Sequence, residues 1–240
     1  MPTWLPAPTS NELRLLVEKP NPLILEVGAA DCEDTKRFLD AFPECRVICF
    51  EPDDRPLARY RRNIPESEQR VTVEPLVVTD IDGMVPWYAS HGAMPTASIP
   101  TYNWQPEVIH DWDMSGSTCR PTGHLKQSKW VTFSSPAQKQ GVRLDTYAAR
   151  NHLGVVDFIW ADVQGAEHKL IDGASELLKR TRFLFTEFYD VQLCNNQQKL
   201  PDYYEGQHNL GSIMAKLLGW SIRSFHIGDN VLLENKGFTQ

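Results

Sequence analysis

The chain has 240 residues, of which 41% are hydrophobic and 23% are charged, so it has ample apolar material for a core and is neither disordered nor collagen-like as a whole. Its 24 basic and 31 acidic residues give a formal net charge of −7, and we interpret the short basic cluster at 59–62 as a solvated face. Nucleic acid is therefore not an expected partner. The five scattered cysteines, the lack of a signal-peptide pattern and the lack of a long apolar run predict a cytoplasmic protein without membrane insertion.

The first half of the chain shows strands alternating with helices. Residues 1–22 are rich in proline around a short amphipathic stretch, which we interpret as an N-terminal cap on the domain. The first strand is expected at 23–27, where a continuous apolar run holds one acid and stops at Gly28, as in a parallel strand covered on both faces. The next elements are expected to be a helix at 34–42, a strand at 46–50, a helix at 55–63 and a strand at 71–78.

The second half resumes the alternation after a long interruption. Residues 83–140 show no sustained periodicity, and we interpret them as an insertion. Beyond it we expect a strand at 155–161, a helix over 170–178, a strand at 182–188, a helix capped by Asn209, and strands at 220–225 and 230–234. This order predicts a single Rossmann-like α/β domain over 1–240, with a mostly parallel sheet and an antiparallel C-terminal hairpin at one edge.

Ligands of such a sheet bind beyond the carboxyl ends of its strands, so the residues that follow each strand matter most. After the first strand, Gly28 permits a tight turn, and Ala29 and Ala30 keep large side chains away from a ligand. The second strand ends at Glu51, 23 positions after Gly28, where an acid can accept hydrogen bonds from both hydroxyls of a ribose. The alternative for Glu51 is a surface carboxylate that caps the next helix. Together, Gly28 and Glu51 favour a nucleoside site.

The charge of the first turn discriminates between nucleoside cofactors. Residues 28–34 contain one glycine and three acids, whereas a dinucleotide requires several glycines around its pyrophosphate. Carboxylates repel a pyrophosphate but tolerate the sulfonium and ammonium of S-adenosylmethionine. The pattern therefore favours a methyl donor and disfavours a nicotinamide dehydrogenase.

At this point the chain resembles a known family, the FkbM-type methyltransferases. The resemblance covers roughly residues 23–235 and is carried by LEVGAA at 25–30, FEP at 50–52, DIDG at 80–83, RLDT at 143–146, DFIWADVQGAE at 157–167, TEF at 186–188 and YEGQ at 204–207. It implies the class I methyltransferase fold with seven strands, S-adenosylmethionine as cofactor, and methylation of a hydroxyl on a sugar or natural product. Two departures stand out: Cys32, where the family usually has glycine, and Gln164, where it usually has glutamate. Cys32 is small enough to leave the donor site open, whereas Gln164 is a poor base or metal ligand.

The expected site residues lie at the ends of the strands. The cofactor is expected to contact Glu26, Gly28, Ala29, Ala30, Glu51, Pro52, Thr79, Asp80 and Asp162. In-line transfer to oxygen also needs a group that takes the hydroxyl proton, and the candidates for catalysis are Asp162, Glu167 and Glu187. Each candidate has an alternative: Asp162 as a helix N-cap, Glu167 as an acid in a first helical turn, and Glu187 as a carboxylate at a strand tip.

Three further questions concern metal, acceptor and activity. Asp162 and Glu187 could together hold Mg²⁺, but carboxylates at strand tips are common without metal, so we expect no metal site. The insertion at 83–140 is rich in aromatic and hydroxyl side chains, which fits a lid over a glycan or small-molecule acceptor, or a lid packed by its own aromatic side chains. The oligomeric state stays open. The alternative function is a non-catalytic glycan-binding or scaffold protein on a degenerate methyltransferase fold.

Overall fold

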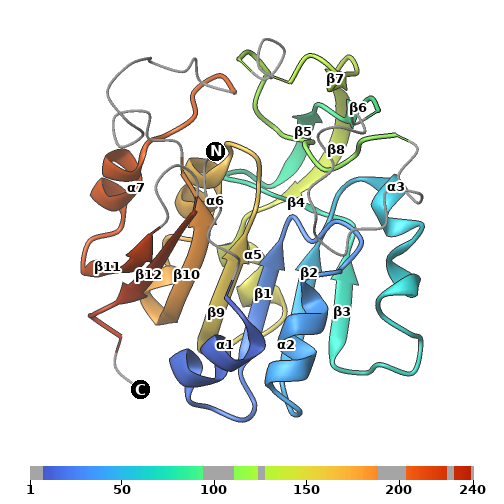
Figure 1. Ribbon diagram of the computed structural model, residues 1–240. Helices are drawn as coiled ribbons and strands as arrows, with labels where there is room; N and C mark the ends of the chain where they lie inside the picture. The colour runs from blue at the N-terminus through green and yellow to red at the C-terminus, as the bar shows by residue number, and fades with distance from the viewer. Residues whose placement is uncertain (1–7, 94–110, 124–127, 189–203, 226–229, 239–240) are drawn as a thin grey trace.

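A seven-stranded sheet forms the centre of the protein. The computed structural model describes residues 8–93, 111–123, 128–188, 204–225 and 230–238 (Figure 1). In spatial order the strands are β11 (Trp220–Phe225), β12 (Asn230–Asn235), β10 (Thr181–Glu187), β9 (Val156–Ala161), β1 (Leu23–Val27), β2 (Arg46–Phe50) and β3 (Val71–Glu74). All pairs are parallel except those of β12, which runs antiparallel to both β10 and β11. The predicted fold class is confirmed, although β12 lies inside the sheet and β11 alone forms the edge at the antiparallel end.

Helices cover both faces of this sheet because its central strands are apolar on both sides. Successive residues of β1 alternate between the two faces: Ile24 belongs to one buried cluster and Leu25 to the other, and all six residues of β9 are buried. One face is covered by α1 (Ser10–Val17) and α2 (Thr35–Ala41). The other is covered by α5 (Leu144–Arg150), α6 (Glu167–Gly173) and α7 (Leu210–Lys216).

The strand predicted at 71–78 is two strands. β3 ends at Glu74, and β4 (Val77–Val78) leaves the main sheet to pair with β8 (Ala137–Val142). Pro75 explains the break, because it has no N–H to donate to a neighbouring strand. The amide of Leu76 instead donates to the carbonyl of Glu74 at 2.8 Å, which turns the chain away from the sheet edge.

The helix predicted at 170–178 is also shorter than expected. It begins earlier, as α6, and ends at Gly173, before the short 3₁₀ turn η4 (Leu178–Arg180). Asp145 captures the backbone beyond this end, since its carboxylate accepts hydrogen bonds from the amides of Glu176 and Leu177 at 3.0 and 2.8 Å. A distant side chain therefore ends a helix that the local pattern would continue.

The helix predicted at 55–63 is divided into α3 (Asp54–Leu57) and a 3₁₀ turn, η1 (Tyr60–Arg62). Pro56 is the only buried residue of α3, and η1 has none. This segment lacks the apolar stripe that fixes a continuous helix against a core.

The insertion contains short strands that its sequence did not predict. Besides β8, its described residues form β5 (Gly83–Trp87), β6 (Ser90–His91) and β7 (Thr132–Phe133). β5 pairs with β8, and β6 pairs with β7. These small sheets stand above the carboxyl ends of the parallel strands (Figure 1). Across the described ranges, no helix combines the length and the apolar character needed to cross a membrane.

Candidate functional site

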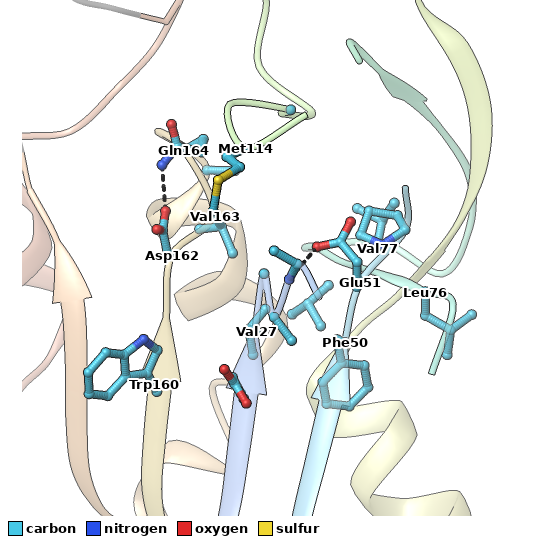
Figure 2. Close-up of a pocket in the computed structure, with 18 of the residues that line it drawn as sticks. Val27, Phe50, Glu51, Leu76, Val77, Met114, Trp160, Asp162, Val163 and Gln164 are labelled. Carbon is cyan, nitrogen blue, oxygen red and sulfur yellow. Dashed lines mark hydrogen bonds between the residues drawn. The ribbon is translucent and has the colours of Figure 1, made fainter. Parts of the chain in front are cut away.

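A pocket opens at the carboxyl edge of the sheet, beneath the insertion. Its empty volume, together with the part open to solvent, is about 910 Å³. Figure 2 shows Glu51 and Val77 on one side of the pocket, and Asp162, Gln164 and Met114 on the other. The predicted residues that line it are Glu26, Gly28, Ala29, Ala30, Glu51, Pro52 and Asp162.

Gly28 allows three strand ends to meet at this pocket. Its φ is +80°, and a Cβ at this position would lie 1.9 Å from the backbone oxygen of Asp162. The amide of Gly28 donates to the carbonyl of Phe50, and the amide of Asp162 donates to the carbonyl of Val27, each at 2.9 Å. The turn after β1 is thereby fixed to the ends of β2 and β9. This observation gives Gly28 a steric role, because no other residue fits so close to a neighbouring backbone.

Glu51 ties the loop after β1 to the loop after β2. The residue is 6% exposed, and its carboxylate accepts hydrogen bonds from the amides of Ala30 at 2.9 Å and Asp53 at 2.7 Å. Burial raises the pKa of Glu51 to about 8, against the opposing effect of these two hydrogen bonds. Each carboxylate oxygen has two lone pairs, so one amide bond leaves capacity for a ligand. The alternative role as a helix cap is wrong, since Asp53 caps α3.

Glu26 forms part of the floor of the pocket. It is buried within β1, where its carboxylate accepts hydrogen bonds from the hydroxyl of Thr35 and, at 3.4 Å, from the thiol of Cys49. Burial raises the pKa of Glu26 to about 8. A carboxyl group buried to this extent favours a cation nearby, since a positive charge would stabilise its ionised form.

The pocket is acidic on one part of its wall and apolar on another. The acids that line it are Glu26, Asp31, Glu33, Asp34, Glu51, Asp113 and Asp162. No Lys, Arg or His is among the described residues of the lining. Phe50, Leu76, Val77 and Val78 provide the apolar part. This combination suits a ligand with a flat apolar ring system and positive charge, and it disfavours a pyrophosphate.

The ends of β9 and β10 bring two of the candidate catalytic acids together. The side-chain amide of Gln164 donates to Asp162 Oδ1 at 2.5 Å and to Glu187 Oε2 at 3.3 Å. Asp162 lines the pocket, whereas Glu187 does not. In the part of the chain that the structure describes, no three His, Cys, Asp or Glu side chains gather as a set of metal ligands.

The remaining predicted residues lie outside the pocket lining. Glu167 is buried at the start of α6, where it accepts a hydrogen bond from the amide of Gly165 at 3.2 Å and where burial raises its pKa to about 7. The amide of Thr79 donates to the carbonyl of Val142, and the carbonyl of Thr79 faces Gly173 of α6. Asp80 is exposed. The break after β3 explains this displacement, because it places residues 76–78, rather than Thr79 and Asp80, at the pocket.

The insertion supplies pocket residues that the sequence did not identify. Asp113 lines the pocket and forms a two-pronged ion pair with Arg59, with distances of 2.5 and 2.7 Å. Arg59 also reaches Asp31 of the loop after β1 at 3.4 Å, so it does not belong to a solvated face as predicted. Trp87 lies against Gly116, where a Cβ would approach the indole to 2.4 Å. No periodic signal marks Asp113 or Met114, because they lie in irregular backbone held by these contacts.

Comparison with known proteins finds a matching family model and a similar protein. A family model described as the methyltransferase FkbM domain matches residues 26–217. The 2-O-methyltransferase NoeI of Sinorhizobium fredii is 36% identical over 202 residues, which cover 84% of this chain and 73% of that protein.

Solved structures resemble the chain more distantly. A protein from Klebsiella pneumoniae assigned as an O-methyltransferase has a TM-score of 0.49 and 11% identity, over 94% of this chain and 77% of that chain. The plantazolicin methyltransferase BpumL, solved in complex with SAH, has a TM-score of 0.46 and 10% identity, over 95% of this chain and 80% of that chain. Both scores lie below 0.5, so neither likeness bears on the chemistry of this pocket.

Proposed function

The chain belongs to the FkbM methyltransferase family and is a methyltransferase, and from that premise we propose that it transfers a methyl group from S-adenosylmethionine to a hydroxyl group of a sugar. The observation that carries this proposal is the pocket at the ends of β1, β2 and β9, in which the buried carboxylate of Glu51 faces a cavity lined by acids. The donor, the oxygen acceptor and the sugar are supported by different features.

The donor fits the chemistry of the pocket lining. The ribose hydroxyls are hydrogen-bond donors, and the Glu51 carboxylate has acceptor capacity beyond its two backbone partners. Leu76 and Val77 offer an apolar surface for adenine beside Glu51, while the acids near Asp31 suit an ammonium group. S-adenosylmethionine supplies an electrophilic methyl carbon attached to a sulfonium. A nicotinamide dinucleotide would instead bring a pyrophosphate to carboxylates.

An oxygen acceptor is supported by a relative. The homologue NoeI is named a 2-O-methyltransferase, and its similarity covers most of both chains. A sugar is supported by Trp87, Met114 and Thr118, which line the pocket on the side of the insertion. An indole beside a hydroxyl side chain is a common setting for a sugar ring, because the apolar face of the ring packs on the aromatic and its hydroxyls bond to polar neighbours.

Asp162 is the residue that we assign to proton removal. It is the one candidate acid that lines the pocket, whereas Glu167 and Glu187 lie outside its lining. Its position at the end of β9, on the opposite side of the pocket from Glu51, places it away from the proposed ribose site (Figure 2). Asp162 would take the proton of the acceptor hydroxyl, which is the work of a general base, as that oxygen bonds to the methyl carbon, the carbon–sulfur bond of the donor breaks and S-adenosylhomocysteine leaves.

The test uses S-adenosylmethionine labelled in the methyl group, with a panel of pyranosides and of alcohols without a sugar ring. We expect label in a sugar product that survives mild base, as a methyl ether does and a methyl ester does not. Asp162→Asn should lower kcat by at least a hundredfold, whereas Glu74→Ala, outside the pocket, should leave kcat unchanged. Label only in a base-labile product or only in alcohols without a sugar ring would refute the acceptor. Glycan binding without transfer would favour the scaffold alternative.

A further inference from the structure

Gln164 occupies an unusual backbone position at the reacting side of the pocket. Its φ is +52°, a left-handed conformation that is costly for a residue other than glycine, and the next residue, Gly165, has φ +87°. This turn directs the side chain of Gln164 back over the end of β9 toward Asp162 (Figure 2). Backbone strain of this kind persists only where surrounding contacts hold it.

Those contacts come from two separate parts of the chain. The backbone carbonyl of Gln164 accepts a hydrogen bond from the hydroxyl of Ser117 at 2.8 Å. The hydroxyl of Tyr204 lies 3.5 Å from Gln164 Oε1 and donates to the carbonyl of Ser115 at 2.7 Å. The Tyr204 ring packs on Gly165, where a Cβ would lie 2.9 Å from the ring. Gln164 is therefore fixed by the insertion and by the segment before α7.

The nitrogen of the Gln164 amide faces two carboxylates. It lies 2.5 Å from Asp162 Oδ1 and 3.3 Å from Glu187 Oε2, so these two oxygens are less than about 6 Å apart. The amide has two N–H donors, one for each carboxylate. The opposite orientation would point Oε1 at two negative groups, so the electrostatics fix which end of the amide faces them.

Two carboxylates at this separation repel each other when nothing positive or hydrogen-bonding lies between them. Such pairs normally take up a proton or a cation, which raises the pKa of one member. A glutamine amide supplies hydrogen bonds to both members without taking up or releasing a proton. Among the residues that the structure describes, Glu167 of α6, Cys119 of the insertion and Tyr204 are acids that lie near this pair, and the ammonium of Lys169 bonds to Thr118.

We propose that Gln164 is a positioning residue whose amide takes the place of a divalent cation between Asp162 and Glu187, so that Asp162 stays ionised and aimed at the acceptor without a metal. This inference rests on the proposed function of Asp162 as base. From the sequence, Gln164 was only a poor base or metal ligand at a position where the family usually has glutamate. The proposal gives its amide a role of its own.

The decisive variant is Gln164→Glu, which puts a third carboxylate between the other two. We expect it to bind Mn²⁺ with a dissociation constant at least tenfold lower than that of the wild type, measured by titration calorimetry without donor or acceptor. In EDTA its kcat should fall at least tenfold and should recover when Mn²⁺ or Mg²⁺ is added. Wild-type kcat should be the same in EDTA and in Mg²⁺. Gln138→Glu, the same substitution at an exposed position of β8, is the matched control.

A second variant, Gln164→Leu, removes the donor without adding charge. Its acid limb in the dependence of kcat on pH should move upward by about one unit, because one carboxylate then keeps a proton to higher pH. A purely structural role would lower the melting temperature and leave this limb in place. Wild-type activity that requires Mg²⁺, or a Gln164→Glu variant with wild-type Mn²⁺ affinity, would overturn the proposal. The Mn²⁺ titration needs no donor. It therefore tests whether the Gln164 amide takes the place of a cation between the two carboxylates even if S-adenosylmethionine is not the donor.

Discussion

Replacing Glu51 by alanine removes the carboxylate at the proposed ribose end of the pocket. In the protein without ligand this carboxylate accepts hydrogen bonds from the amides of Ala30 and Asp53, so it both shapes the pocket and offers acceptor capacity to a ligand. The pKa of Glu51 is raised to about 8, so the comparison is made above that pH, where its carboxylate is charged. A hydrogen bond to a charged group contributes about 1.5–3 kcal/mol, which corresponds to a roughly 10- to 150-fold change in affinity. We expect Glu51→Ala to weaken the binding of S-adenosylhomocysteine by at least tenfold.

The same substitution has a structural cost that the assay must separate from binding. It leaves the amides of Ala30 and Asp53 without their acceptor, at about 1–3 kcal/mol for each donor that stays buried. Removal of a buried acid with a raised pKa offsets part of this loss. Glu51→Gln is the smaller perturbation, because its amide oxygen still accepts one of the two N–H groups. The loss of affinity should therefore be smaller for Glu51→Gln than for Glu51→Ala.

Titration calorimetry with S-adenosylhomocysteine, at a temperature well below the melting temperature of every variant, gives the comparison. Glu74→Ala is the matched control, because Glu74 ends the neighbouring strand β3, bonds to the Tyr147 hydroxyl at 2.8 Å and does not line the pocket. Wild-type affinity in Glu51→Ala would refute the ribose assignment. An equal loss in Glu74→Ala would show that the effect of Glu51 is a general loosening of the sheet edge.

Three further predictions concern the frame of the pocket. Gly28→Ala should lower the free energy of unfolding by at least about 3 kcal/mol in guanidinium titrations, because its Cβ meets the Asp162 backbone at 1.9 Å, whereas Gly154→Ala, with open space around it, should change it by less than about 1 kcal/mol. Arg59→Ala leaves the Asp113 carboxylate buried without its ion-pair partner and should raise the KM for the donor severalfold. The control, Arg61→Ala, changes an exposed residue and should leave this KM unchanged. Equal KM values in the two variants would show that the ion pair does not shape the pocket. Burial raises the pKa values of Glu26, Glu51 and Glu167, so the folded state holds protons that the unfolded state has released. The free energy of unfolding should therefore fall as the pH rises from 6.5 to 8, by up to about 1.4 kcal/mol per pH unit for each of these three groups. A rise over that window would refute the raised pKa values.

The strands that form the pocket were predictable because their signals are local. A continuous apolar run that ends at Gly28, and another that ends at Glu51, identify two buried parallel strands and the residues beyond their carboxyl ends. The structure confirms the seven-stranded sheet and brings both residues to one pocket. The position of Gly28 and Glu51 at the ends of their strands was therefore enough to predict that they lie at one pocket.

The rest of the site depends on contacts between distant segments. Pro75 diverts the chain after β3, which carries Asp80 away from the pocket. The partner of Asp113 is Arg59, 54 positions earlier in the chain, and the amide of Gln164 bonds to Glu187, 23 positions later. No local period encodes such pairings, since each depends on where the folded backbone places both partners. The roles of Arg59 and Gln164 follow only from the folded arrangement.

The most direct test of the central claim is a crystal structure of the protein with S-adenosylhomocysteine bound. We expect the adenine to lie against Leu76 and Val77, the ribose hydroxyls to lie within 3.2 Å of the Glu51 carboxylate, and the sulfur to lie on the side of Asp162. A ligand bound elsewhere, or in this pocket with Glu51 out of hydrogen-bonding distance of its ribose, would contradict the claim.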